Sequence, residues 1–185
     1  MILRETSLPG AYLIEAEPRC DARGHFARTF CAGTFKAHGL AAHFDQISTS
    51  YNRHAGIVRG LHLQRPPYAE AKLVRVTAGA IYDVIVDVRA GSPTYGSWAG
   101  FELSAANGRQ LYIPEGFAHG FQTLAEGTEV AYHITEAYAP EHADGVRWDD
   151  PELAITWPAP ENAVLSERDR GLGTLADFTA VELPC

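Results

Sequence analysis

Cysteine is scarce in this 185-residue sequence, and its three cysteines do not have the spacing of a metal or redox site. Cys20, Cys31 and Cys185 are odd in number, and no two of them are separated by two residues. A disulfide framework or a structural zinc site is therefore not expected. The chain must instead bury a hydrophobic core, for which one domain spanning residues 1–185 is long enough.

Long apolar runs and excess positive charge are also missing. No apolar stretch approaches the roughly 18 residues that a membrane-spanning helix needs, and the start lacks the basic and apolar regions of a signal peptide. Fifteen Lys and Arg stand against 23 Asp and Glu, a net charge of −8. An acidic chain is not expected to bind nucleic acid in general, although a local Arg cluster can still hold a small anion. We expect a cytoplasmic protein without a nucleic-acid or membrane partner.

The histidines lack the spacing of a barrel metal site, which usually needs His-x-His followed by Glu. The residue two positions after His62 is Gln64, and His119 is followed by Gly120 and Phe121. The other six histidines provide no ligand pair either. We therefore predict that no metal is bound.

Short strands and frequent turns dominate what is present. Strands are expected at residues 72–77, 81–88, 111–113 and 129–135, with Gly, Pro and Asn between them. A short helix is expected at residues 32–38, with Gly39 as its stop signal. The pair Asn107-Gly108 predicts a hairpin turn. This pattern indicates an all-β fold, an antiparallel sandwich or barrel. Its core is expected at about residues 45–150, with an N-terminal arm and a C-terminal tail packed on it.

Alternation along these strands places polar groups among apolar ones. Tyr132 shares a strand face with Val130 and Ile134, and Lys72 shares one with Val74 and Val76. Such a Tyr or Lys lies either at the rim of a barrel or inside a cavity.

Three segments carry groups suited to acid–base chemistry. His62 can accept a proton near neutral pH, and Lys72 can hold a developing oxyanion, although a core histidine and a surface lysine would fit the spacing too. His119 can face a pocket or occupy a tight corner. Tyr132 can act as an acid and Tyr138 can stack on a base, or both can be core aromatics. Asp169 can orient a histidine if the tail folds back.

Read together, these segments resemble the dTDP-4-dehydrorhamnose 3,5-epimerase family, a branch of the cupin-like jelly-roll barrels. The resemblance covers about residues 10–170, and its most specific run is Ile113 to Phe121. Other matching segments are residues 21–26, 56–64, 71–76, 82–89, 92–95, 103–107, 147–151 and 165–169.

The resemblance implies an epimerase that acts on a nucleotide-diphospho-4-keto-6-deoxy sugar through an enolate, without a cofactor. It implies His62 as base, Asp169 as its orienting partner, Tyr132 as acid and Lys72 as the charge that stabilises the C4 oxygen. It also implies a homodimer in which N-terminal strands cross to the partner sheet. The residues that it implies for substrate binding are Arg23, Phe26, Gln46, Arg59, His119, Tyr138 and Arg168.

Three departures from the family pattern concern nucleotide recognition. Arg28 stands where a Glu is usual, Ser48 stands where an Asn is usual, and Ala143 lies near the place of a missing Glu. An arginine only donates hydrogen bonds, whereas a glutamate accepts them. Arg28 and Ser48 are therefore retained as candidate binding residues. The departures indicate either another nucleobase or variation among thymidine users.

The leading hypothesis is an epimerase that inverts C3, C5 or both, and the sequence leaves alternatives to it. Within enzymes, the alternatives are a 3-epimerase alone and an epimerase of CDP- or GDP-sugars. A non-catalytic sugar-binding cupin is the alternative from another class, but a binder needs no acid–base pair. A metal-dependent cupin oxygenase is not expected, because the histidines lack the spacing of its metal ligands.

Overall fold

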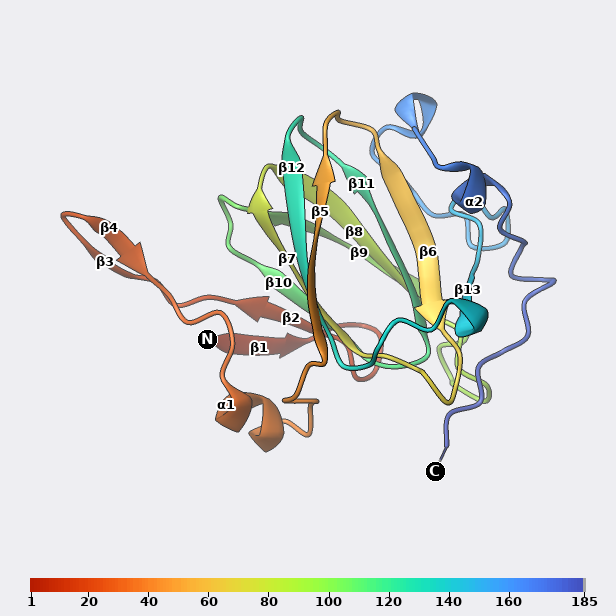
Figure 1. Ribbon diagram of the computed structural model, residues 1–185, viewed down its shortest axis with the longest axis horizontal. Coiled ribbons are helices and arrows are strands. Elements are labelled where there is room, and N and C mark those ends of the chain that lie inside the picture. The colour runs from red at the N-terminus through yellow and green to blue at the C-terminus, as the bar shows by residue number, and fades with distance from the viewer. Residues whose placement is uncertain (185) are drawn as a thin grey trace.

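The computed structural model describes residues 1–184 and is built mainly from two antiparallel sheets (Figure 1). The six-stranded sheet has the order β1-β2-β10-β7-β12-β5, and the five-stranded sheet has the order β13-β6-β11-β8-β9. The architecture is a cupin-like jelly roll, which confirms the all-β expectation. The strands of the first sheet are β1 (Ile2–Glu5), β2 (Tyr12–Glu15), β10 (Gln110–Ile113), β7 (Lys72–Ala78), β12 (Thr128–Ile134) and β5 (Gln46–Asn52). Those of the second are β13 (Ala143–Gly145), β6 (Val58–Gln64), β11 (Phe117–Thr123), β8 (Ala80–Asp87) and β9 (Trp98–Ser104).

A separate hairpin projects away from the two sheets (Figure 1). It consists of β3 (Arg19–Asp21) and β4 (Gly24–Phe26), which pair only with each other. The helix α1 (Ala32–Ala37) follows, and Gly39 ends it with a φ of 70°, as predicted from the sequence. The remaining helical turns are η1 (Pro140–His142), η2 (Pro160–Asn162) and α2 (Glu167–Arg170).

Apolar side chains from both sheets fill the space between them. Val74, Val76 and Val130 meet Ile85 and Phe121 of the opposite sheet in one buried cluster. Tyr132 packs against this cluster, so its strand face points inward as the alternation predicted. The two-residue period therefore brings the polar members of the same face into the barrel interior.

The outer faces of the sheets are covered by the two ends of the chain. Phe35 of α1 and Phe44 pack on the outer side of β2, β10 and β7 around Leu73. The C-terminal segment covers the outer side of the five-stranded sheet, where Trp157 and Leu175 pack on Leu61. This second packing is what brings α2 beside β6 (Figure 1).

The prediction of a hairpin at Asn107-Gly108 is wrong. The turn chemistry is present, because the Asn107 side chain accepts hydrogen bonds from the backbone N–H groups of Ser104 and Arg109, and Gly108 has a φ of 62°. The flanking strands do not pair, however: β9 pairs with β8, and β10 pairs with β2 and β7. The turn carries the chain from one sheet to the other.

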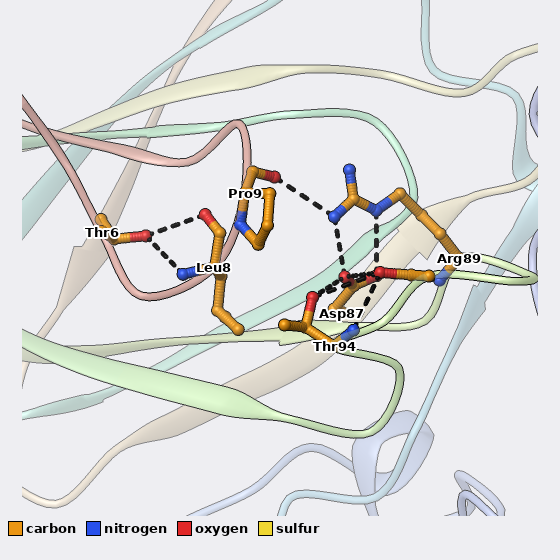
Figure 2. Close-up of polar contacts among 7 residues, drawn as sticks. Thr6, Leu8, Pro9, Asp87, Arg89 and Thr94 are labelled. Carbon is orange, nitrogen blue, oxygen red and sulfur yellow. Dashed lines mark hydrogen bonds and ion pairs between the residues drawn. The ribbon is translucent and has the colours of Figure 1, made fainter.

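A buried carboxylate ties the loop after β8 to the turn between β1 and β2 (Figure 2). Asp87 is fully buried and accepts five hydrogen bonds, from the Arg89 backbone and guanidinium and from the hydroxyls of Ser92 and Thr94. Arg89 also donates to the Pro9 carbonyl at 3.2 Å. The two sheets are therefore joined by polar contacts at these loops as well as by the core.

Among residues 1–184, the helices are all too short or too polar to cross a membrane.

Candidate active site

A cavity of about 420 Å³ lies between the two sheets, and most of the candidate catalytic and binding residues line it. One wall comes from β5, β7 and β12, and the other comes from β6, β11 and α2. In the first wall, Tyr132 of β12 lies opposite Val74 of β7 and Ser48 of β5. The candidate residues that line the cavity are Ser48, Arg59, His62, Lys72, His119, Tyr132, Arg168 and Asp169.

Two glycines allow β6 and β11 to approach closely at the second wall. Gly60 has a φ of 122°, and a Cβ built on it would lie 2.5 Å from the Cα of Gly120. A Cβ on Gly120 would in turn lie 2.6 Å from the Arg59 carbonyl oxygen. The strand register shifts at this point, between His119 and Phe121. Just beyond the shift, His62 and His119 are direct cross-strand partners on the cavity side.

His62 is held by a carboxylate from the C-terminal segment. Its Nε2 donates to Asp169 Oδ1 at 2.6 Å, and the Asp169 side chain is only 5% exposed. Burial by itself would raise the pKa of Asp169, but hydrogen bonds from His62, Ser166 and the Gly60 backbone hold that pKa below its usual value. Asp169 therefore stays ionised and fixes the His62 proton on Nε2, which leaves Nδ1 with a lone pair that can accept a proton.

Tyr132 faces the cavity from the opposite sheet. Burial strongly raises the pKa of its phenol, and the nearby Asp83 charge raises it further, while Arg59 opposes them. The hydroxyl is therefore protonated at neutral pH. Its ring lies edge-on to His119, with 6.2 Å between the ring centroids.

Lys72 brings a positive charge to the same cavity at the start of β7. Its ammonium pairs with Glu70 Oε1 at 3.0 Å and donates to the His62 carbonyl at 3.3 Å. Both side chains of this ion pair are largely buried, at 12% and 5% exposure. The pairing holds the lysine head group at the cavity wall near His62.

His119 and Arg59 each have a polar partner behind them. His119 Nε2 bonds Asp83 Oδ1 at 2.5 Å, and both side chains are buried. The Arg59 Nε donates to Asn52 Oδ1 at 2.9 Å. These contacts orient one imidazole and one guanidinium on the wall that also carries His62.

A second cavity of about 160 Å³ adjoins the first, and His62, Lys72, Ile134 and Arg168 line both. Three further residues line the smaller cavity but not the larger one: Gln46, Tyr138 and Ala143. Tyr138 is 58% exposed, and its hydroxyl accepts a hydrogen bond from Arg168 at 3.3 Å. The arrangement extends the site from the acid–base groups toward an exposed aromatic ring.

Three predicted binding residues do not reach this site within one chain. Arg23 and Phe26 lie on the projecting hairpin, where Arg23 pairs with Asp21 at 2.6 Å and Phe26 is 76% exposed. Arg28 follows the hairpin and, with Phe26, lines a separate surface cavity at its base. Their roles in substrate binding stay predictions, because one chain alone does not bring these residues to the cavity.

Three residues of the site were missed by the sequence reasoning: Asp83, Gln64 and Glu70. Asp83 carried a usable signal, because it alternates with Ile81 and Ile85 on a face that is otherwise apolar. Gln64 follows His62 by two residues and therefore shares its face. Glu70 lies in a loop and carried no periodic signal.

Within residues 1–184, no group of three or more His, Cys, Asp or Glu side chains is placed to hold a metal ion.

Comparisons with known proteins show the family of this chain. Residues 5–177 match the family model described as dTDP-4-dehydrorhamnose 3,5-epimerase. A protein of that name from Sinorhizobium fredii is 44% identical over 178 residues, covering 96% of this chain and 91% of its own. The Bacillus anthracis enzyme, solved with TDP and PPi bound, is 45% identical, with a TM-score of 0.90 and coverage of 94% and 98%.

A third protein extends the comparison to a bound sugar nucleotide. The Legionella pneumophila dTDP-6-deoxy-D-glucose-3,5-epimerase, solved in complex with dTDP-4-keto-L-rhamnose, is 37% identical, with a TM-score of 0.92. The alignment covers 100% of this chain and 99% of that one. With sequence, fold and near-complete coverage in agreement, this chain belongs to the dTDP-4-dehydrorhamnose 3,5-epimerase family of isomerases.

Proposed function

We propose that this enzyme inverts C3 and C5 of dTDP-4-dehydro-6-deoxy-D-glucose. The observation that carries the proposal is the placement of an oriented imidazole and a protonated phenol on opposite walls of one cavity, which the Lys72 ammonium also lines. The bound TDP and dTDP-4-keto-L-rhamnose of the two solved relatives support the substrate class.

The first step is removal of a proton next to the C4 ketone. His62 Nδ1 takes the proton from C3 or C5, because Asp169 holds the other ring nitrogen protonated. The electron pair of the broken C–H bond moves into the ring and gives an enolate with its charge on the C4 oxygen. The Asp169 carboxylate stabilises the imidazolium that forms.

Lys72 stabilises the charge that develops on the C4 oxygen. Its ammonium is held by Glu70 and the His62 carbonyl before substrate arrives, so little reorganisation accompanies the reaction. One preorganised donor of this kind contributes about 3–4 kcal/mol to the transition state.

The second step returns a proton from the other face of the sugar. Tyr132 lies on the sheet opposite His62, and its raised pKa keeps the hydroxyl proton in place until the enolate accepts it. A proton delivered opposite to the one removed inverts the carbon. His62 then releases its proton to solvent and Tyr132 regains one, so the second carbon can react in the same way.

The nucleotide occupies the cavity beyond these groups. Arg59, His119 and Arg168 provide positive or hydrogen-bonding groups for the diphosphate and sugar oxygens. Gln46 and Ser48 lie on neighbouring inward positions of β5. Tyr138 presents an exposed ring on which the nucleobase stacks.

A second copy of the chain completes this site. The hairpin β3–β4 projects from the body with Phe26 exposed (Figure 1), and β5 is the edge strand of the six-stranded sheet, with Ile47 and Tyr51 exposed. A hairpin from another copy placed along the β5 edge would bring Arg23, Phe26 and Arg28 next to Gln46 and Ser48. The homodimer expected from the family resemblance thus accounts for the three residues that one chain leaves apart.

Deuterium incorporation tests the proposed reaction. The enzyme is incubated in D₂O with dTDP-, CDP- and GDP-linked 4-keto-6-deoxyglucose, and the label is located by NMR. Label at both C3 and C5 of the dTDP-sugar, with weaker reaction of the other two, is expected. Label at C3 alone would identify a 3-epimerase, and no label in any substrate would identify a non-catalytic binder.

A further inference from the structure

Gln64 is a buried polar residue that none of the steps above uses. It lies two residues after His62 at the end of β6, on the same strand face, and is 5% exposed. Its Nε2 donates to the carbonyls of Tyr68 at 2.9 Å and Ala137 at 3.1 Å. Its Oε1 accepts from the backbone N–H of Ala139 at 2.7 Å.

These contacts hold the backbone on both sides of Tyr138. The Ala137 carbonyl and the Ala139 N–H are the polar backbone groups immediately before and after that residue. The segment lies beyond the end of β12, so strand pairing does not fix it. The Tyr138 ring itself is 58% exposed at the smaller cavity and receives one hydrogen bond, from Arg168. The Gln64 amide is therefore the main buried polar contact that sets the backbone beneath the ring.

Only a neutral amide fits this set of partners. Two carbonyl oxygens require two donors, and one N–H requires an acceptor, which a glutamine provides together. A carboxylate of the same shape has no donor, so it would face two carbonyl oxygens with like partial charge. The position therefore discriminates between glutamine and its isosteric acid.

We propose that Gln64 is a positioning residue that holds Tyr138 in place for the nucleobase and couples that ring to the strand carrying His62. The inference rests on the proposed function, in which Tyr138 stacks on the base. A ring held in its binding position before the ligand arrives loses less entropy on binding, so a loosened ring binds the nucleotide more weakly.

The test measures the dissociation constant of dTDP by calorimetry for the full-length enzyme and four variants. Tyr138→Ala is expected to weaken binding between about fivefold and about 100-fold, the range for losing one stacked base. Gln64→Glu is expected to weaken it about tenfold, with the kinetic loss in KM rather than in kcat. The double variant is expected to bind no more weakly than Tyr138→Ala alone, because both changes act through one ring.

Gln122→Glu is the matched control. Gln122 is also buried, and its amide clamps the backbone of Ala159 by two hydrogen bonds, at 2.7 and 3.0 Å, outside both cavities. The Gln122→Glu variant introduces the same negative charge into a similar set of buried hydrogen bonds, and it is expected to leave dTDP binding unchanged. If Gln64→Glu does not fold, Gln64→Met removes the hydrogen bonds without adding charge and takes its place.

The outcomes separate this inference from the function on which it rests. If Tyr138→Ala binds dTDP normally, the stacking role fails and the inference fails with it. If Tyr138→Ala weakens binding but the Gln64 variant binds normally, only the inference is overturned. The same holds if the two effects multiply in the double variant, or if the Gln122 control weakens binding as much.

Discussion

The surroundings of Tyr132 differ from those of His62, and this difference matches the two steps of the proposed reaction, proton return and proton removal. Burial and the Asp83 charge both raise the pKa of its phenol, so the hydroxyl keeps its proton at neutral pH. His62, by contrast, lies 34% exposed beside an ionised carboxylate. These surroundings fit the proposed roles, in which Tyr132 gives a proton and His62 takes one.

Removing the Tyr132 hydroxyl is expected to stop inversion without stopping proton removal. In Tyr132→Phe, His62 can still abstract the substrate proton and return solvent deuterium to the same face. Inverted product is expected to fall by about 10²- to 10⁴-fold, the usual loss for a general acid. NMR in D₂O measures both quantities at once. Inverted sugar formed at the wild-type rate would identify another proton donor, with Tyr138 or a water as the next candidates.

The Lys72–Glu70 pair is expected to matter for stability as well as for chemistry. Lys72→Met leaves the Glu70 carboxylate buried without its partner, which costs about 3–5 kcal/mol of the free energy of unfolding. Adding Glu70→Leu removes the stranded charge, so the double variant is expected to regain most of that loss in urea denaturation. A double variant less stable than Lys72→Met would contradict this account of the pair.

At the scale of elements, two loops outside the cavity depend on one carboxylate. Burial alone would raise the pKa of Asp87, but its hydrogen bonds from Arg89, Ser92 and Thr94 outweigh that effect and lower it. The lowered pKa means that Asp87 stabilises the fold above the unfolded value of about 4, and that this contribution is lost as the pH falls through the folded pKa.

Asp87→Asn is therefore expected to destabilise the protein in a pH-dependent way. At pH 7 the variant should be less stable by about 1–3 kcal/mol, because hydrogen bonds to a buried charge are replaced by weaker ones. The difference from wild type should begin to shrink below about pH 4, where Asp87 of the unfolded wild-type chain takes up a proton, and should be lost as the pH falls through the lower pKa of the folded state. Urea denaturation at pH 7 and pH 3.5 measures it, and an equal difference at both values would rule the charge out as the cause.

Local patterns predicted much of the fold, whereas the acid–base roles of His62, Tyr132, Lys72 and Asp169 came from the family resemblance and stay predictions. Alternation placed Lys72 and Tyr132 on inward faces, and the strands 72–78 and 128–134 differ from expectation by one residue at their ends. The hairpin prediction at Asn107-Gly108 was wrong, because a turn sequence does not determine whether the next strand pairs with the previous one or joins another sheet. Gln64 was not found as a contact residue, because its partners Ala137 and Ala139 are 73 and 75 residues away.

At the scale of the whole molecule, the packing of the chain ends determines which groups meet. The C-terminal segment covers the outer side of the five-stranded sheet and thereby delivers Asp169 to His62 across 107 residues. The N-terminal hairpin instead leaves the body and exposes Phe26. No local pattern encodes either placement, since both depend on how distant segments pack.

Replacing the hairpin β3–β4 by a short Gly-Ser linker is expected to give a monomer that binds dTDP more weakly. The wild-type mass by light scattering should be about twice the 20.1 kDa of one chain, and that of the variant should equal one chain. In the proposed homodimer, Arg23, Phe26 and Arg28 of one copy reach the nucleotide site of the other, so the variant is expected to lose both the contact between copies and these binding groups. A wild-type monomer with full activity would contradict the proposed assembly.

The central claim is that His62 removes the protons beside the C4 ketone, and the most direct test is solvent exchange in His62→Ala. The variant and the wild-type enzyme are incubated in D₂O with dTDP-4-dehydro-6-deoxy-D-glucose, and deuterium at C3 and C5 is followed by NMR, with circular dichroism to confirm folding. The account predicts that the folded variant exchanges neither proton, while the wild type exchanges both. Exchange in the variant within about threefold of the wild-type rate, where loss of a general base should cost at least about 100-fold, would show that another group is the base.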